Sequence, residues 1–249
     1  MSHRSPYAGA GILAVAALVL WGFSADAAIP TAEKIANAVA EMNRVSGRAV
    51  PVLVDITLTM GDSALAITGV LASHPTGLAR LELRTEAFVE RHLLQGNVHT
   101  ASRDGQMLSA PYPLLPPLFF LQATSGAALR AALASFGVPA VEVVLGRVGD
   151  RDCYVFGGRL ARSEDGEQQM LPSLWVDMES YEVLLINRPD GVRFRFGPTA
   201  DFGGIRLPSW IDVESPELPT AHLVVDRVVP ANAPAAAFGS HWLSAPPNP

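Results

Sequence analysis

Residues 112–138 read YPLLPPLFFLQATSGAALRAALASFGV, and this stretch decides how the rest of the chain must fold. Proline lacks an amide donor and has a fixed φ, so the proline-rich first half cannot form a central strand. Ser125 can cap a helix that carries Leu129, Leu133 and Phe136 on one face and stops at Gly137. We expect a curved sheet to wrap around this apolar segment, with an apolar ligand between them. The alternative is ordinary core, since an apolar face usually serves packing.

The flanking sequence reads as short β-strands joined by turns. Apolar and polar residues alternate from Val52 to Met60, and Gly61-Asp62-Ser63 then predicts a turn. Two short strands are expected around Gly96-Asn97, and Arg103-Asp104-Gly105 predicts another hairpin turn. Hairpin connections make the sheet antiparallel, and a large twisted sheet tends to curl. No repeat or linker is visible, which indicates one domain that is mainly β.

The N-terminus has the features of an export signal. His3 and Arg4 precede an apolar run, and Ser24-Ala25-Asp26-Ala27 has the A-x-A pattern of a cleavage site. We predict a signal peptide over residues 1–27 that is cleaved after Ala27; the alternative is an uncleaved anchor. An amphipathic helix is then expected from Pro30 to about Val45. The proline-rich residues 244–249 are expected to form a loose tail.

Charge, hydrophobicity and cysteine content limit what the protein can bind and how it is stabilised. The formal net charge is −6, which argues against nucleic acid as a partner, because such binding needs clustered Lys and Arg. The hydrophobic fraction is 49% and the charged fraction 17%, which is more apolar than a soluble core requires. Cys153 is the only cysteine, so no internal disulfide can form, and we expect a buried thiol.

No catalytic or metal-binding motif stands out. The sequence contains neither G-x-S-x-G nor H-E-x-x-H, and none of the six histidines has ligand spacing with another. His92 and His99 could approach across a hairpin, but two surface histidines are favoured over a metal site. We therefore predict that the protein is not an enzyme and holds no cofactor.

Motifs spread along the chain resemble the periplasmic lipoprotein carriers of the LolA-like superfamily. The matching positions, in chain order, are Gly69-x-Leu71, Pro75, Leu78–Glu82, Asp104-Gly105-Gln106-Met107-Leu108, Pro116–Leu121, Leu174–Asp177, Phe194, Phe196, Gly204-x-x-Leu207-Pro208 and Phe238. Each motif is weak alone, and their order and spacing carry the resemblance. It implies an α+β fold, mainly β, over residues 28–243. A single curved antiparallel sheet would form an unclosed half-barrel, with an N-terminal helix and an inserted helical lid over a hydrophobic cavity.

The resemblance also implies a function. The protein would be a periplasmic carrier that binds the acyl chains of lipoproteins or lipids and moves them between membranes. Its partners would be an acylated lipoprotein or lipid, a donor protein of the inner membrane and an acceptor protein of the outer membrane, with the carrier itself a monomer. The alternatives are a lipid- or lipoprotein-sensing domain with a membrane partner and a lipid hydrolase, which would need Ser, His and Asp in one cleft.

Cavity-lining residues follow from the expected strand faces and lid. These are Ile56, Leu58, Ile67, Leu81, Leu83, Phe119, Phe120, Trp175, Phe194, Phe196 and Trp210, of which about half are expected to be plain core. The carriers have an arginine just before the proline of the second hairpin. His74 stands there in this chain and is the candidate gating residue, although histidine carries a charge only part of the time near neutral pH.

Overall fold

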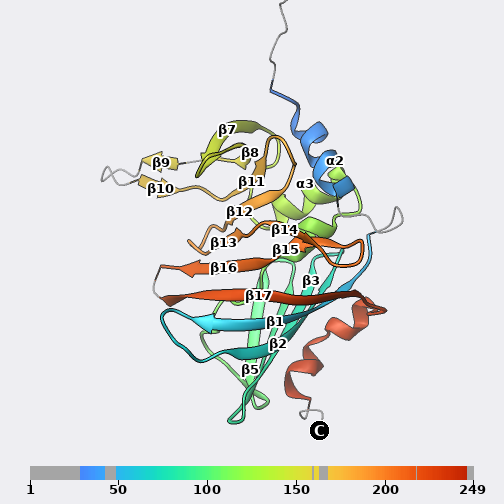
Figure 1. Cartoon of the computed structure of the whole chain (residues 1–249), viewed down its shortest axis with the longest axis vertical. Coiled ribbons are helices and arrows are strands. Elements are labelled where there is room, and N and C mark those ends of the chain that lie inside the picture. The colour runs from blue at the N-terminus through green and yellow to red at the C-terminus, as the bar shows by residue number, and fades with distance from the viewer. Residues whose placement is uncertain (1–28, 43–48, 159, 163–167, 217, 246–249) are drawn as a thin grey trace, which may run out of the picture.

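The fold is one large antiparallel sheet that curves around a small group of helices, as a computed structural model of the 249-residue chain shows (Figure 1). The structure describes residues 29–42, 49–158, 160–162, 168–216 and 218–245. The predicted signal peptide lies outside the described residues, as do residues 246–249 of the predicted tail. Ser244, the first residue of that tail, ends a short 3-10 helix.

Thirteen strands form the main sheet, in the order β6-β5-β4-β3-β2-β1-β17-β16-β13-β12-β11-β8-β7. Two further two-stranded sheets pair β9 with β10 and β14 with β15. The first half of the main sheet comprises β1 (Val52–Met60), β2 (Ile67–His74), β3 (Leu78–Arg84), β4 (Val89–Gln95), β5 (Val98–Arg103) and β6 (Gln106–Met107). The second half comprises β7 (Val143–Val148), β8 (Arg151–Gly157), β11 (Ser173–Asp177), β12 (Val183–Asn187), β13 (Arg193–Phe196), β16 (Trp210–Ser215) and β17 (Leu218–Pro230). The small sheets are formed by β9 (Leu160–Arg162), β10 (Gln168–Met170), β14 (Thr199–Asp201) and β15 (Arg206–Pro208).

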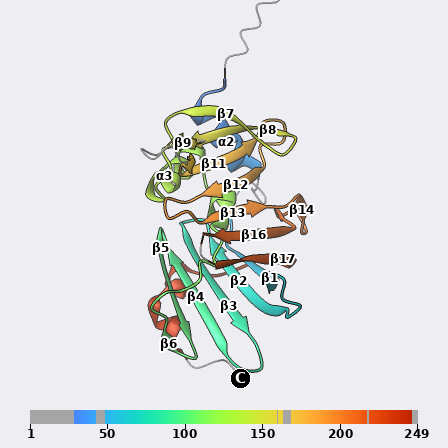
Figure 2. The same cartoon turned by 90° about the vertical axis from the view of Figure 1, so that its left-hand side faces the viewer.

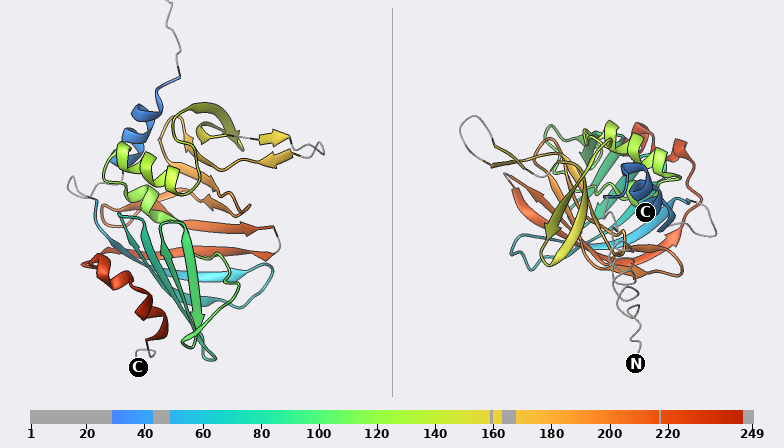
Figure 3. Two further views of the ribbon diagram at one scale, coloured as in Figure 1. Left: turned by 180° about the vertical axis from the view of Figure 1, so that it is seen from behind. Right: turned by 90° about the horizontal axis from the view of Figure 1, so that it is seen from above.

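The main sheet is not closed into a barrel. Its two halves join where the C-terminal strand β17 pairs with β1, and the edge strands β6 and β7 are not paired with each other. The view from above in Figure 3 shows the sheet curving, with the helices on its inner side. This is the predicted α+β half-barrel. The predicted hairpin around Gly96-Asn97 is confirmed as the β4–β5 pair.

Two α-helices and a 3-10 helix occupy the inner side. Helix α2 (Ala32–Met42) buries Ile35, Ala36 and Val39, and its last predicted residues lie outside the described part of the chain. The proline-rich stretch leads into the 3-10 helix η1 (Leu118–Gln122), and α3 (Gly126–Ser135) follows. The Ser125 side chain accepts a hydrogen bond from the Ala128 amide, so the predicted N-cap is confirmed. Gly137 has φ of 80°, the left-handed conformation that ends a helix.

A C-terminal segment covers part of the outer, convex face. It contains the 3-10 helices η2 (Ala235–Phe238) and η3 (Ser240–Ser244), which contact β3, β4 and β5. Phe238 and Leu243 pack with Ala72 and Leu93 in a hydrophobic cluster separate from the main core. In Figures 1 and 2 this segment lies at one end of the molecule, while α2 and α3 lie at the other.

Candidate ligand-binding site

The inner face of the sheet and the helices share one apolar core. It takes Ile56 and Leu58 from β1, Leu81 and Leu83 from β3, and Phe194 from β13, each at most 2% exposed. These residues alternate with outward-facing neighbours, as the pleat of a strand requires. Because the lid side chains are buried against this wall, the structure holds the interior closed.

The 3-10 helix η1 is the innermost part of the lid. The rings of Phe119 and Phe120 both pack against Phe136 at the end of α3, with centroids 5.9 and 5.2 Å away. The Ser73 hydroxyl donates a hydrogen bond of 2.6 Å to Oε1 of buried Gln122, whose Nε2 donates to the Val50 carbonyl at 2.7 Å. Gln122 therefore fixes η1 to β2 and to the residues before β1.

Helices α2 and α3 are joined above η1. The Gly126 amide donates to Oδ1 of Asn37 at 3.1 Å. A Cβ atom on Gly126 would come within 2.3 Å of that oxygen, so only glycine allows the helices to approach this closely. The two helices and η1 thus form one connected lid on the inner face.

An open apolar hollow of about 770 Å³ lies at the end of the half-barrel where the β1–β2 and β3–β4 loops meet. It is lined by Leu65, Ala66, Ile67, Thr68, Arg84, Thr85, Glu86, Ala87 and Phe88. Its volume lies within the range of small-molecule sites. Ile67 lines the hollow and also packs against the closed core. The hollow therefore adjoins the apolar interior, and we call it the mouth.

The β3–β4 turn holds one wall of the mouth in place. The Thr85 hydroxyl accepts hydrogen bonds from the amides of Ala87 and Phe88, both at 3.1 Å. Leu65 on the facing loop is 66% exposed. The Leu65 side chain is therefore available to contact an apolar group that enters the mouth.

Most of the predicted lining residues lie either in the closed core or at the mouth. Those in the closed core are Ile56, Leu58, Leu81, Leu83, Phe119, Phe120, Phe194 and Phe196, while Ile67 lies at the mouth. Their role in binding a ligand stays a prediction. Leu65 and Phe88 were missed because they lie in loops, where no strand period identifies the inner face.

Trp175 and Trp210 do not lie where the sequence predicted, on the wall of the cavity, because both face away from the main core. Trp175 packs with Cys153 and Val155 in a cluster separate from the core that holds its neighbours in β11. The indole of Trp210 lies 5.7 Å from the His222 ring, whereas Ile211, the next residue, is in the main core. Successive side chains of a strand point to opposite faces, so neither indole lines the inner wall.

His74 also lies on the convex side. Its ring packs edge-on against Phe238 at 5.8 Å, and Nδ1 lies 2.7 Å from the Thr76 hydroxyl. Burial lowers the pKa of His74 below its ordinary value. These contacts are with its own turn and with the C-terminal segment, and its gating role stays a prediction.

A polar chain on the inner wall was not expected from the sequence. Glu90 and His92 of β4 share a face with Leu94, which belongs to the main core. Nε2 of His92 lies 2.8 Å from Oε1 of Glu90, and Nδ1 of His92 lies 3.1 Å from Nε2 of His99 on β5. His92 is fully buried, so the expectation of two surface histidines is wrong.

Arg103 ends this chain beside the mouth. Its guanidinium donates to Oε2 of Glu90 through Nε and Nη2, at 2.9 and 2.6 Å, and lies 4.5 Å from the centroid of the Phe88 ring. Burial alone would raise the pKa of Glu90, but hydrogen bonds from His92 and Arg103 hold it below its usual value. Glu90 is therefore a carboxylate at neutral pH.

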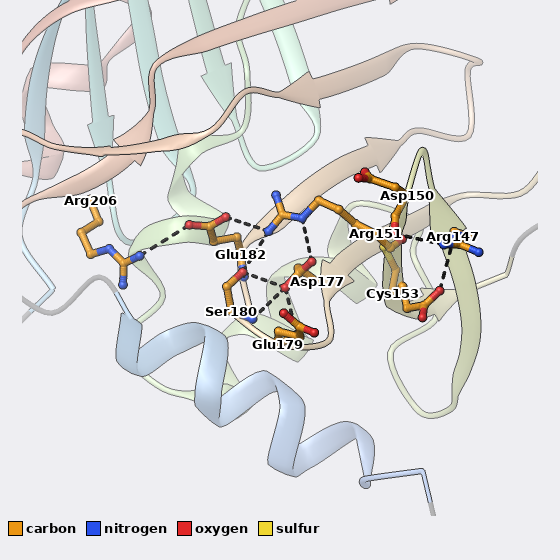
Figure 4. A network of polar contacts seen from close by, with 10 residues as sticks. Arg147, Asp150, Arg151, Cys153, Asp177, Glu179, Ser180, Glu182 and Arg206 are labelled. Carbon is orange, nitrogen blue, oxygen red and sulfur yellow. Dashed lines mark hydrogen bonds and ion pairs between the residues drawn. The ribbon is translucent and has the colours of Figure 1, made fainter.

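A second polar network, drawn in Figure 4, lies in the half of the sheet that contains β8, β11 and β12. Arg151 of β8 donates to Asp177 at 2.7 Å and to Glu182 at 3.0 Å, joining β8 to the β11–β12 turn. Glu182 also lies 3.5 Å from Arg206 on β15. Asp177 caps the turn by accepting from the amides of Glu179 and Ser180. These contacts give the network a structural role.

The described residues contain no group of three or more His, Cys, Asp and Glu side chains placed to hold a metal ion. Cys153 is buried, as predicted, and burial raises the pKa of its thiol. Within the described ranges, the helices are too short or too polar to cross a membrane.

Comparisons with known proteins identify the fold. No protein-family model and no curated protein sequence matches the chain. A crystal structure of a LolA superfamily protein from Nitrosomonas europaea matches with a TM-score of 0.52 and 14% identity, over 86% of this chain and 100% of the other. A domain described as an outer membrane lipoprotein-sorting protein domain, from Vibrio parahaemolyticus, matches with a TM-score of 0.53 and 7% identity, over 85% and 97%. These similarities show that the protein has a LolA-like fold.

Proposed function

We propose that this protein, which has a LolA-like fold, is a periplasmic carrier for the acyl chains of lipoproteins or lipids. A chain would bind first at the mouth and then lie between the inner face of the sheet and the lid. The single observation that supports this most is the open apolar mouth. The mouth adjoins a core that the sheet shares with the three short elements of the lid, η1, α2 and α3. The carrier would move its ligand from an inner-membrane donor to an outer-membrane acceptor.

The energetics favour such a ligand. Each buried methylene contributes about 0.8 kcal/mol, so a long acyl chain contributes on the order of 10 kcal/mol before the cost of ordering it. Because the interior is closed in this structure, the lid must shift to admit the whole chain. Within the described part of the chain, Gln122 links η1 to Ser73 of β2 and to the Val50 carbonyl by two side-chain hydrogen bonds. These two bonds would have to break for η1 to move away from the sheet.

The first test measures binding of a fluorescent long-chain fatty acid to the purified, delipidated protein. Leu65→Asp at the mouth places a charge against the bound chain and is expected to weaken binding by about 10-fold or more, since one leucine contact is worth roughly 1.5–3 kcal/mol. Val224→Asp is the matched control, because Val224 is 38% exposed on the convex face of β17. Equal binding by both variants would exclude the mouth as the site.

The second test separates a carrier from a sensor. The loaded protein is mixed with acceptor vesicles, and a carrier is expected to deliver the labelled lipid to them. Retention of the lipid together with a stable complex with a membrane protein would favour the sensing domain instead. Absence of any bound lipid, both in the binding assay and in mass spectrometry of the protein purified from cells, would contradict lipid binding altogether.

A further inference from the structure

A groove on the convex face gathers three arginines around one glutamate. Side chains alternate along β3, so that Leu81 and Leu83 enter the core while the positions between and beside them face outward, namely Arg80, Glu82 and Arg84. The groove has a volume of about 370 Å³, within the range of small-molecule sites. It is lined by Leu53, Val70, Ala72, Arg80, Glu82, Arg84, Arg91, Trp242 and Ala245, and we call it the arginine groove.

The strands form the floor of the arginine groove and the C-terminal segment forms one wall. On the floor, Leu53 of β1 lies opposite Ala72 of β2. At the wall, the Arg91 guanidinium of β4 donates hydrogen bonds to the carbonyl oxygens of Trp242, at 3.1 Å, and of Ala245. Arg91 is only 5% exposed. A buried charged side chain therefore fixes the wall against the sheet.

Positive charge exceeds negative charge in this groove. Glu82 is the one acidic residue among its described lining residues, against three arginines, which gives a formal excess of +2 (three minus one). Both carboxylate oxygens of Glu82 are used, because Oε1 accepts from Arg84 at 2.8 Å and Oε2 accepts from Arg91 at 2.7 Å. Arg80 and Arg91 also lie over the same Trp242 ring, 5.2 and 5.4 Å from its centroid. Two cations thus share one aromatic ring.

Arg80 has hydrogen-bond donors available for a ligand. A guanidinium carries five N–H donors. Nη1 of Arg80 donates to the Ala237 carbonyl at 2.8 Å, and no carboxylate in the described part of the chain forms an ion pair with this guanidinium. Burial lowers the pKa of Arg80, the charge of Glu82 opposes this effect, and the charge of Arg91 adds to it. An anion in the groove would accept from Arg80 and reduce the repulsion between the two cations.

We infer that the arginine groove binds a phosphate group, which belongs either to a lipid headgroup or to a free phosphate compound. Planar guanidinium groups match the oxygens of phosphate with pairs of hydrogen bonds. A phosphate monoester carries about −1.5 to −2 charges at pH 7, which balances the excess of +2, whereas a carboxylate carries only one. The apolar side chains of Leu53 and Val70 leave a surface for the organic part of the ligand.

Calorimetric titration of the purified protein at pH 7.5 in dilute, phosphate-free buffer tests the ligand chemistry. Inorganic phosphate is expected to bind at least about 10-fold more tightly than acetate, because the strength of the attraction increases with the charge of the ligand. The source of the phosphate is tested with dihexanoyl phosphatidic acid in the Leu65→Asp variant, in which the mouth is disabled. Tighter binding of this lipid than of inorganic phosphate assigns the groove to a headgroup, and equal binding assigns it to a free phosphate compound.

Two variants locate the site. Arg80→Gln removes a guanidinium, and Val70→Asp places a negative charge in the groove without touching the C-terminal segment's hydrogen bonds; each should weaken phosphate binding about 10-fold or more. Val70 is 44% exposed, so the second variant is expected to fold even if the first does not. The matched controls are Arg147→Gln on the edge strand β7, where Arg147 is 64% exposed, and Val224→Asp on the convex face of β17.

Three results would overturn the inference. They are the absence of phosphate binding by the wild type, equal affinity for acetate and phosphate, and a folded groove variant that binds phosphate no more weakly than its control. The site is independent of acyl binding at the mouth, because Arg80 and Val70 do not line the mouth. Leu65→Asp should therefore bind inorganic phosphate like the wild type, and either proposal can fail without the other.

Discussion

Replacement of Gln122 by methionine tests how the lid is held to the sheet. Gln122 is 5% exposed and makes two side-chain hydrogen bonds, of 2.6 Å from Ser73 and 2.7 Å to the Val50 carbonyl. Methionine has a similar length and no amide, so Gln122→Met leaves a hydroxyl and a carbonyl without their partner. Each buried group left unsatisfied costs about 1–3 kcal/mol, so we expect a loss of roughly 2–6 kcal/mol in the free energy of unfolding for the two groups.

A double-mutant cycle separates this anchor from general packing. Ser73→Ala alone removes one hydrogen bond and should cost about 1–2 kcal/mol. In the double variant no hydroxyl is left unsatisfied, so the combined loss should be smaller than the sum by about 1 kcal/mol. Urea denaturation followed by circular dichroism gives each free energy of unfolding. Gln95→Met is the control, because Gln95 is an exposed glutamine that donates to the Phe238 carbonyl, and it should cost less than about 1 kcal/mol.

The reasoning fails if Gln122→Met is as stable as the wild type, or if the two substitutions are strictly additive. Either result would mean that η1 is held by its apolar side chains alone. The same variant should also loosen the lid, so hydrogen exchange in η1 is expected to accelerate more than exchange in β17.

Three further predictions follow from single contacts. Burial alone would raise the pKa of Asp177, but hydrogen bonds from Ser180 and Arg151 keep this pKa below its usual value. Ionised Asp177 therefore stabilises the fold at pH values above its ordinary pKa of 3.8, and this contribution is lost as the pH falls further. Asp177→Asn should therefore cost about 2 kcal/mol at neutral pH and flatten the acid limb of a plot of Tm against pH; an unchanged acid limb would contradict this. Gly69→Ala should destabilise by roughly 1–3 kcal/mol in urea denaturation, because its Cβ would lie 2.7 Å from a methyl group of Leu83; a neutral result would mean that this leucine repacks freely. The buried thiol of Cys153 should react with a thiol reagent only after unfolding, and rapid labelling of the native protein at mildly alkaline pH would disprove its inaccessibility.

Local pattern was enough to predict the individual elements. Ser125 and Gly137 mark the ends of α3 because a side-chain cap and a left-handed glycine act within a few residues. From Val52 to Thr59 the β1 strand alternates between buried and half-buried residues, so Ile56 and Leu58 could be assigned to the inner face.

Where both faces of a strand are buried, the alternation that identifies the inner face is lost. All five residues of β11 and all five of β12 are buried, so their hydrophobicity cannot say on which side Trp175 lies. Trp210 was misassigned for a different reason. It is an apolar residue at the start of β16, and its indole packs on the outer face against His222.

Order along the chain thus determined the turns, the helix ends and the antiparallel pairing of neighbours, since these depend on contacts between residues close in sequence. The position of β17 beside β1 depends instead on pairing across more than 150 residues, and this pairing joins the two halves of the sheet. The mouth between the loops at Leu65 and Phe88 exists only once the sheet curves around its lid. Curvature is a property of the whole packed sheet, and for that reason the tertiary structure alone decides which side chains enclose the site.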